Sequence, residues 1–120
     1  HTPGLWANTC CTHPHWGESA IDCATRRLTE ELGLTGLTLT PVGQVEYRAE
    51  VGNGLIEHEL VDIFTAEAPL TVQITPNPAE VMATQWLPLA TLTAQTITDP
   101  ARFTPWLRIY LADHPHLLAP

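Results

Sequence analysis

The spacing of apolar residues changes along the chain, and each spacing predicts a kind of secondary structure. From Ser19 to Leu32, apolar residues recur three and four positions apart, as on one face of an amphipathic helix. Ser19 can cap the start of this helix, and Gly33 can end it. We therefore expect a helix over residues 19–32, with a buried stripe made of Ile21, Ala24, Leu28 and Leu32.

After this helix the apolar pattern becomes that of strands. Residues 37–40 alternate, residues 43–49 continue extended, and Gly52-Asn53-Gly54 signals a turn into a second extended run from Leu55 to Thr65. This pattern predicts a β-hairpin. The other expected elements are extended segments over residues 5–11, 71–74 and 80–87 and short helices over residues 89–92 and 105–111.

Strands on both sides of one clear helix place the chain in the α/β or α+β class, with a mixed sheet. Its 120 residues suffice for one hydrophobic core, so we expect a single domain over residues 1–120. No apolar run approaches the roughly 20 residues that a membrane-spanning helix needs. No signal peptide is visible either, so we expect no membrane partner.

The charge of the chain narrows the classes of ligand. The net charge is −8, from 13 acidic and 5 basic side chains, which argues against a nucleic-acid partner. All the basic side chains are arginines, so an anionic ligand calls for a divalent metal to offset the repulsion. Three cysteines, an odd number, indicate reduced thiols in a cytoplasmic protein.

Two neighbouring side chains near the start of the chain are candidates for acid/base chemistry. On an extended segment, Cys11 and His13 project from the same face, whereas Cys10 points away. A cation or a metal-bound histidine can tune the ionisation of a nearby thiol. The alternative is structural: Cys11 would be a small buried residue, and His13 a loop histidine before a proline.

A second candidate lies on the predicted second strand of the hairpin. There Glu57 and Glu59 share one face, about 6–7 Å apart along the strand. Two such carboxylates can converge on one cation, and one of them can serve as a general base. The alternative is a solvated strand face, although Val61 and Ile63 continue the same face and make it border an apolar surface.

The predicted helix carries a third candidate. Arg27 and Glu31 are four residues apart and can form a simple exposed ion pair. An aromatic residue, Trp106, follows Pro105; tryptophan is usually core or interface material, but it is also suited to face a cation.

Taken together, several segments resemble the metal-dependent (type I) isopentenyl-diphosphate isomerases, a branch of the Nudix fold. The matching segments, from Pro3 to about Leu111, are PGLWANTCCTHP, GESAIDCATRRLTEELG, EYRA, GLIEHELVDIF, EVMATQWLPL and FTPW. The resemblance implies a Nudix-type mixed β-sheet packed between helices. It also implies an isomerase of isoprenoid biosynthesis that interconverts isopentenyl and dimethylallyl diphosphate by adding and removing a proton.

The resemblance implies roles for particular residues. The family's acid/base cysteine falls on Cys11, and its second acid/base group falls on Glu59, which works with Tyr47. The family's Mn²⁺- or Zn²⁺-type site falls on His13, Glu57 and Glu59. Cys10 is then a neighbour without a role.

The remaining implied roles concern the isoprenoid diphosphate substrate. Glu31 falls on the glutamate that holds Mg²⁺ against the diphosphate, and Arg27 falls where an arginine can help to bind it. Trp106 matches the tryptophan that faces the cationic carbon. We expect a monomer or weak dimer.

The sequence departs from known family patterns in two places, and these differences leave other functions open. Family members carry further histidine ligands and basic residues before the point that corresponds to His1, so we expect the natural protein to be longer and this metal site to be incomplete. The alternatives are therefore a catalytically incomplete metal-binding fragment and a Nudix hydrolase of a nucleoside diphosphate. The hydrolase pattern R-E-x-x-E-E is broken here, because Arg27 stands in the first glutamate's place.

Overall fold

The computed structural model describes residues 4–118, and their backbone divides into two compact units. The hairpin unit comprises residues 4–8, 43–63 and 86–118 of the described chain, and the α1 unit comprises residues 9–42 and 64–85. The prediction of one domain over residues 1–120 stays a prediction. None of the helices within the described range is long and apolar enough to cross a membrane.

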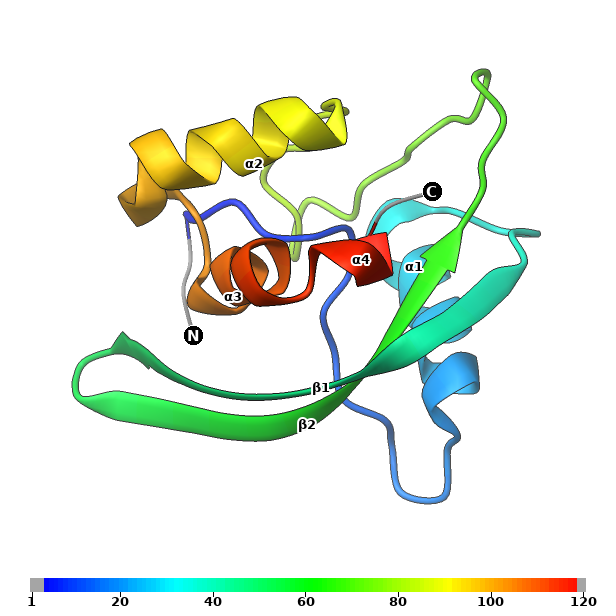
Figure 1. Ribbon diagram of the computed structural model, residues 1–120. Helices are drawn as coiled ribbons and strands as arrows, with labels where there is room; N and C mark the ends of the chain where they lie inside the picture. The colour runs from blue at the N-terminus through cyan, green and yellow to red at the C-terminus, as the bar shows by residue number, and fades with distance from the viewer. Residues whose placement is uncertain (1–3, 119–120) are drawn as a thin grey trace. The chain divides into compact units, whose positions relative to one another are not determined.

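Along the chain, one helix is followed by a pair of strands and then by further helices (Figure 1). In chain order they are α1 (Ala20–Leu32), β1 (Leu39–Gly52), β2 (Leu55–Ala66), α2 (Leu89–Thr98), the 3₁₀ turn η1 (Pro100–Arg102), α3 (Pro105–Asp113) and α4 (Pro115–Leu118). Helices and a sheet in one chain confirm the α+β class. In the described residues the sheet is antiparallel and two-stranded, and a parallel bridge joins Trp6 to Phe103.

Helix α1 begins and ends where its capping residues predict. The Ser19 side chain accepts a hydrogen bond from the backbone N–H of Asp22 at 3.2 Å. Gly33 takes the left-handed conformation, with φ +65°, and its N–H bonds the carbonyl of Thr29. The predicted stripe is wrong at Ile21, which is 41% exposed, because Cys23 and not Ile21 lies on the buried side of the first turns.

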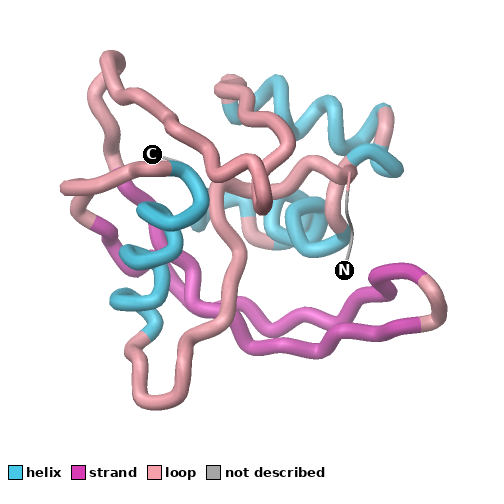
Figure 2. The backbone as a smooth tube through the Cα atoms, turned by 180° about the vertical axis from the view of Figure 1, so that it is seen from behind, coloured by secondary structure: helices cyan, strands magenta, loops and turns pink. Residues whose placement is uncertain are grey.

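The core of the α1 unit is built around the end of this helix. Leu28, Leu32 and Leu34 are buried, and the partly buried residues packed against them are Cys10, Leu37, Leu39, Val72, Ile74 and Val81. The short strand predicted over residues 71–74 is wrong, since these residues form a turn and a loop, and residues 80–87, expected to be extended, lie outside any strand (Figure 2). The backbone between these two segments bonds to the end of α1, since the N–H of Thr75 donates to the carbonyl of Leu32 at 2.8 Å.

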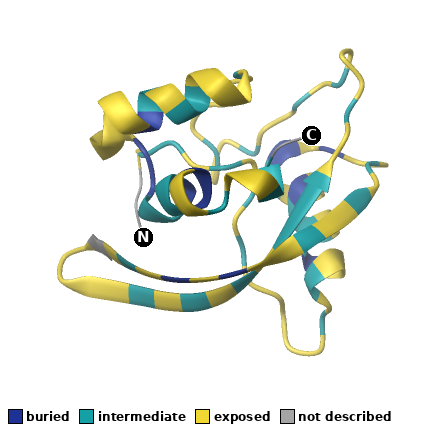
Figure 3. Cartoon of the chain, viewed as in Figure 1, coloured by how far each residue is buried: buried dark blue, intermediate teal, exposed yellow. Residues whose placement is uncertain are grey.

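Strands β1 and β2 form the hairpin that the turn signal predicts. Asn53 and Gly54 connect them with φ values of 54° and 74°, the two positive values that a type I′ turn needs. The extended run expected over residues 43–49 lies within β1, and the run expected over 37–40 joins the same strand only from Leu39 onwards. Burial alternates along it, so Val45 and Tyr47 are 1% and 5% exposed while their neighbours are exposed (Figure 3).

Helix α3 packs on the buried face of the hairpin. Tyr110 lies edge-on to Tyr47, with ring centroids 6.0 Å apart, and shares a hydrophobic cluster with it and with Val45. A second cluster, made of Phe103, Leu107 and Leu111 with Trp6, Leu92, Trp106 and Leu118, lies on another side of the helix. The helix predicted over residues 105–111 is confirmed, and the one at 89–92 extends to Thr98. In the segment predicted as extended over 5–11, strand-like pairing occurs at Trp6.

Replacing Gly33 by alanine tests how the end of α1 packs. A methyl group there would meet Cβ and the carbonyl oxygen of Thr75 at 3.0 Å, in addition to the strain of φ +65°. Gly36 is the matched control, since its φ is +72° and nothing lies within 4 Å of the added atom. We expect Gly36→Ala to lower the free energy of unfolding by roughly 1 kcal/mol and Gly33→Ala by roughly 1 kcal/mol more, measured by urea denaturation. Equal losses would mean that Thr75 does not resist the methyl group.

Candidate functional site

The sheltered face of β2 carries the two carboxylates that the sequence singled out. Glu57 and Glu59 are partly buried, whereas His58 and Leu60 between and after them are exposed. Val61 and Ile63 continue this face and pack in the cluster with Val45, Tyr47 and Tyr110. The prediction that the two glutamates border an apolar surface is confirmed.

Tyr47 of β1 is joined to this face by a hydrogen bond. Its hydroxyl donates to Oε2 of Glu57 at 3.1 Å. Burial raises the pKa of Tyr47 above its ordinary range, and the hydrogen bond to Glu57 and the negative charge of Glu59 act in the same direction. The phenol therefore stays protonated and acts as a hydrogen-bond donor towards the carboxylates.

Trp106 of α3 reaches both hydrophobic clusters of the hairpin unit. It packs against the cluster of Val45 and Tyr47 and also against that of Phe103. Its indole Nε1–H donates a hydrogen bond to Oδ1 of Asn8 at 3.1 Å. The hairpin unit thus associates Trp106 with Tyr47 and the glutamate-bearing strand. Asn8 lies in a segment that the sequence had marked, but nothing in the pattern indicated its partner.

The cysteine segment runs along α1, and α1 determines which side chains face outwards. The Cys10 thiol donates to Oε2 of Glu31 at 2.7 Å, and the Thr12 side chain hydrogen-bonds Cys23. Residues 10 and 12 therefore face the helix, while Cys11 and His13 are exposed. This confirms that Cys11 and His13 share a side that Cys10 does not.

Cys10 nevertheless has a contact that the sequence did not indicate. Burial raises the pKa of its thiol, and the hydrogen bond to Glu31 and the charge of that carboxylate raise it further. Cys10 thus remains a protonated thiol, hydrogen-bonded to one carboxylate oxygen of Glu31. Cys23, which is buried, also has a raised pKa, chiefly because of its burial.

Arg27 is shared among several carboxylates of the α1 unit. Its guanidinium lies 2.6 Å from Glu30, 3.2 Å from Glu31 and 2.6 Å from Glu80. The ion pair with Glu31 is confirmed, although both side chains are only 17% exposed, so it is not a fully solvated pair. Any anion that binds Arg27 must compete with these carboxylates; Glu80 carried no signal of its own in the sequence.

The predicted metal ligands fall in both units. His13 belongs to the α1 unit, and Glu57 and Glu59 belong to the hairpin unit. Among the residues that the structure describes, no three His, Cys, Asp or Glu side chains gather closely enough to hold a metal ion together. The Mn²⁺- or Zn²⁺-type site that the resemblance implies at His13, Glu57 and Glu59 stays a prediction.

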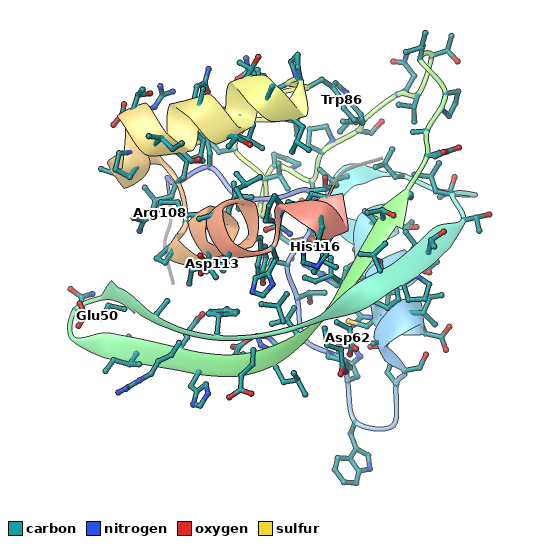
Figure 4. The ribbon with its side chains drawn as sticks, in the orientation of Figure 1. Glu50, Asp62, Trp86, Arg108, Asp113 and His116 are labelled. Carbon is teal, nitrogen blue, oxygen red and sulfur yellow. The ribbon has the colours of Figure 1, made fainter. Side chains whose placement is uncertain are left out.

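An open hollow in the hairpin unit lies apart from the predicted site residues. It has a volume of about 490 Å³ and lies between the end of β1 and helix α3, where Glu50, Arg108 and Asp113 are found (Figure 4). Its other lining residues are Arg48, Ala49, Pro105, Ile109 and Ala112. None of the side chains predicted to act in catalysis or substrate binding lines it.

Comparison with known proteins gives a consistent result. The model of the NUDIX domain matches residues 1–107. A protein named Isopentenyl-diphosphate Delta-isomerase from Cereibacter sphaeroides (strain ATCC 17025 / ATH 2.4.3) is 66% identical over 114 residues, which cover 95% of this chain and 64% of that protein. Proteins of the same name from Dinoroseobacter shibae and Rhodobacter capsulatus are 63% and 56% identical; the matches cover 95% and 100% of this chain and 65% and 68% of those proteins. The chain therefore spans about two thirds of the length of these relatives.

The burial of the three cysteines predicts an order of reaction with an alkylating reagent. Only the thiolate reacts, and raised pKa values disfavour it at Cys10 and Cys23, whereas Cys11 is exposed. We expect iodoacetamide at pH 7.5 to modify Cys11 first, as seen by peptide mass spectrometry of the folded protein. Cys11→Ala should remove the fast phase and Cys10→Ala should keep it. A fast phase that survives in Cys11→Ala would contradict the assigned faces.

The raised pKa of Tyr47 predicts a loss of stability in alkali. The unfolded tyrosine ionises near pH 10 but the folded one does not, so above that pH the unfolded state binds fewer protons and is favoured. We expect the stability difference between the wild type and Tyr47→Phe to be constant up to about pH 9 and then to shrink as the pH rises towards 11. Urea unfolding with EDTA present measures it. A difference that stays constant up to pH 11 would show that the folded phenol ionises normally.

Proposed function

The chain belongs to the Nudix family, in the group of its members named isopentenyl-diphosphate Delta-isomerase, and on this premise we propose that it interconverts isopentenyl and dimethylallyl diphosphate. Since it spans about two thirds of the length of such relatives, its activity, substrate and partners all belong to the proposal. The observation that carries the proposal is the sheltered face of the hairpin, where Tyr47 donates to Glu57 beside an apolar wall.

The reaction sets physical requirements that this face meets in part. Moving the double bond adds a proton to one end of an alkene and removes a proton from a carbon two positions away, so the overall composition does not change. The intermediate is a tertiary carbocation, which water would trap. A site therefore needs two proton-transfer groups, an aromatic face and shelter from solvent.

We assign one of the two proton transfers to Glu59, with Tyr47 beside it. Glu59 lies on the sheltered face of β2, and its charge acts on the Tyr47 hydroxyl. Because Tyr47 stays neutral, it can stabilise a carboxylate through hydrogen bonding without adding negative charge. Trp106 supplies the aromatic face, since indole is the best side chain for facing a cation, and it packs in the same cluster as Tyr47.

The other proton-transfer group in the proposal is Cys11. Its side chain is exposed, so a substrate can reach the thiol. Cys10, by contrast, is occupied with Glu31 and is kept protonated by burial and by that carboxylate. The choice of Cys11 over Cys10 thus rests on the partial burial of the Cys10 side chain against α1 and on its hydrogen bond to Glu31.

Divalent metal forms a separate part of the proposal. One imidazole with carboxylates, the donor set of His13, Glu57 and Glu59, suits Mn²⁺ or Zn²⁺. Glu31 offers carboxylate oxygens suited to Mg²⁺ bound to a diphosphate, and Arg27 lies beside it. Since no three such side chains gather among the described residues, these assignments rest on the types of donor.

The setting that we propose for the protein is the cytoplasm, where the three cysteines would stay reduced. Its partner would be a small isoprenoid diphosphate and not a membrane, and the net charge of −8 argues against nucleic acid. A monomer or weak dimer would suffice.

The structure weighs against the hydrolase alternative. Nudix hydrolases gather glutamates to bind several metal ions, but here Arg27 stands in the first glutamate's place. It also pairs with Glu30 and Glu31, the two glutamates that remain of the pattern. A cation thus occupies the neighbourhood in which the hydrolase would concentrate negative charge for its metals.

The proposal predicts different effects of the two adjacent cysteines on turnover. With isopentenyl diphosphate and Mg²⁺, the protein should form dimethylallyl diphosphate and release no phosphate. Cys11→Ala should lower kcat at least about 1000-fold, because a proton-transfer group is lost, while Cys10→Ala should keep most of the activity. Product analysis by mass spectrometry and a phosphate assay measure the two outcomes.

Two results would overturn this proposal. Release of phosphate from nucleoside diphosphates without isomerisation would identify a hydrolase. Loss of activity in Cys10→Ala but not in Cys11→Ala would show that Cys10, and not Cys11, is the acid/base cysteine. Circular dichroism of both variants shows that the comparison is made between folded proteins.

A further inference from the structure

We propose that Asn8 is a positioning residue for Trp106: its side-chain carbonyl holds the indole N–H and thereby fixes the orientation in which the ring meets the substrate. The contact is the 3.1 Å hydrogen bond from Nε1 of Trp106 to Oδ1 of Asn8, between residues 98 positions apart in the chain. The catalytic consequence rests on the proposed isomerase function, whereas the contact itself does not.

One hydrogen bond can orient this ring because indole has a single polar atom. The N–H group is a donor only, and it lies on one edge of an otherwise apolar ring. Rotation of the ring by half a turn would point the N–H away from Asn8 and leave a partly buried donor without its partner, which costs on the order of 1–3 kcal/mol. Hydrophobic packing tolerates more than one ring orientation, but the hydrogen bond to Asn8 favours one of them.

The backbone holds Asn8 at the right place along α3. The N–H of Trp6 bonds the carbonyl of Arg102 at 2.8 Å, and the N–H of Thr104 bonds the carbonyl of Trp6 at 2.9 Å. These bonds make the parallel bridge between Trp6 and Phe103. The two segments run in the same direction from this bridge. Asn8, two residues after Trp6, therefore lies beside the first turn of α3, within hydrogen-bond distance of Trp106.

The bridge is itself firmly anchored. Thr104 is 2% exposed, and its side chain caps α3 by accepting a hydrogen bond from the backbone N–H of Leu107. Trp6 packs against the cluster of Phe103, Leu107 and Leu111. Asn8 is therefore held by the same piece of structure that starts α3, so its carbonyl presents a fixed acceptor and not a mobile one.

The same short segment also carries the proposed acid/base cysteine. Asn8 lies three residues before Cys11 in the chain. A residue that clamps this segment to the start of α3 sets the aromatic face and the starting point of the cysteine segment together.

The first test observes the hydrogen bond directly and does not need activity. In a ¹H–¹⁵N spectrum the four tryptophans give four indole signals, and Trp106→Phe identifies the signal of Trp106. We expect Asn8→Ala and Asn8→Leu to move this signal upfield in the proton dimension and to speed its exchange with solvent. Asn8→Asp, which keeps an oxygen acceptor, should preserve it. Trp16→Phe is the control, because Trp16 is fully exposed and its removal should leave the Trp106 signal in place.

The second test measures the catalytic consequence. Asn8→Ala should lower kcat about tenfold with little change in KM, because misplacing a group that acts on the transition state costs rate and not ground-state binding. Asn8→Asp should recover most of the rate. In a Trp106→Phe background, Asn8→Ala should add less than about a twofold loss, since the N–H that it holds is already gone.

Each failure has a distinct meaning. An unchanged indole signal in Asn8→Ala overturns the inference, and so does a full additional loss of kcat in the Trp106→Phe background. If the wild type shows no isomerase activity, the proposed function fails, while the indole signal still decides whether Asn8 orients Trp106. Urea denaturation of every variant separates a local change of the ring from loss of the fold.

Discussion

The two-residue period of the β1–β2 hairpin determines which side chains can meet in the hairpin unit. Successive side chains of a strand point to opposite faces, so a single choice of face acts on the whole strand at once. Once Val45 is buried against Tyr110, Tyr47 must be buried as well. On β2 the sheltered positions of Val61 and Ile63 bring Glu57 and Glu59 to the same side. The polar site is thus a consequence of how the apolar residues of the hairpin are packed.

That constraint has an electrostatic effect. The carboxylate of Glu57 lies next to a phenol that burial has made harder to ionise, so the pair meets as a neutral donor and an acceptor. In the α1 unit, Cys10 and Glu31 meet in the same way, and the pKa of the thiol is raised by burial and by the carboxylate. In both places a weak acid is kept protonated beside a glutamate, which lets a strongly acidic chain place carboxylates in partly buried positions.

Features that depend on neighbouring residues in the chain were predicted correctly from the sequence, whereas features that depend on distant residues were not. Capping by Ser19 and Gly33 and the Asn53-Gly54 turn depend on neighbouring residues, and the structure confirms them. The shared face of Cys11 and His13 was also correct, because period alone sets it. The strand expected over residues 71–74 was wrong, since Val72 and Ile74 fill the core beside Leu32 while the backbone of Thr75, which follows them, bonds to the end of α1. Such a partner cannot be read from a local pattern.

The contacts of Asn8, Cys10 and Arg27 escaped prediction for the same reason, and they bear on how an anion could bind. Arg26 and Arg27 are held by carboxylates from α1 and from elsewhere in the α1 unit, so their charges already contribute to the fold. Glu18 illustrates the strength of this pairing, because Arg26 holds the pKa of that carboxyl at about 2. A diphosphate approaching Arg27 would have to displace Glu30 or Glu80, or approach with a metal ion that these carboxylates also attract. Of the two routes, binding with a metal ion breaks fewer existing ion pairs, because the carboxylates of α1 attract the metal ion and need not leave Arg27.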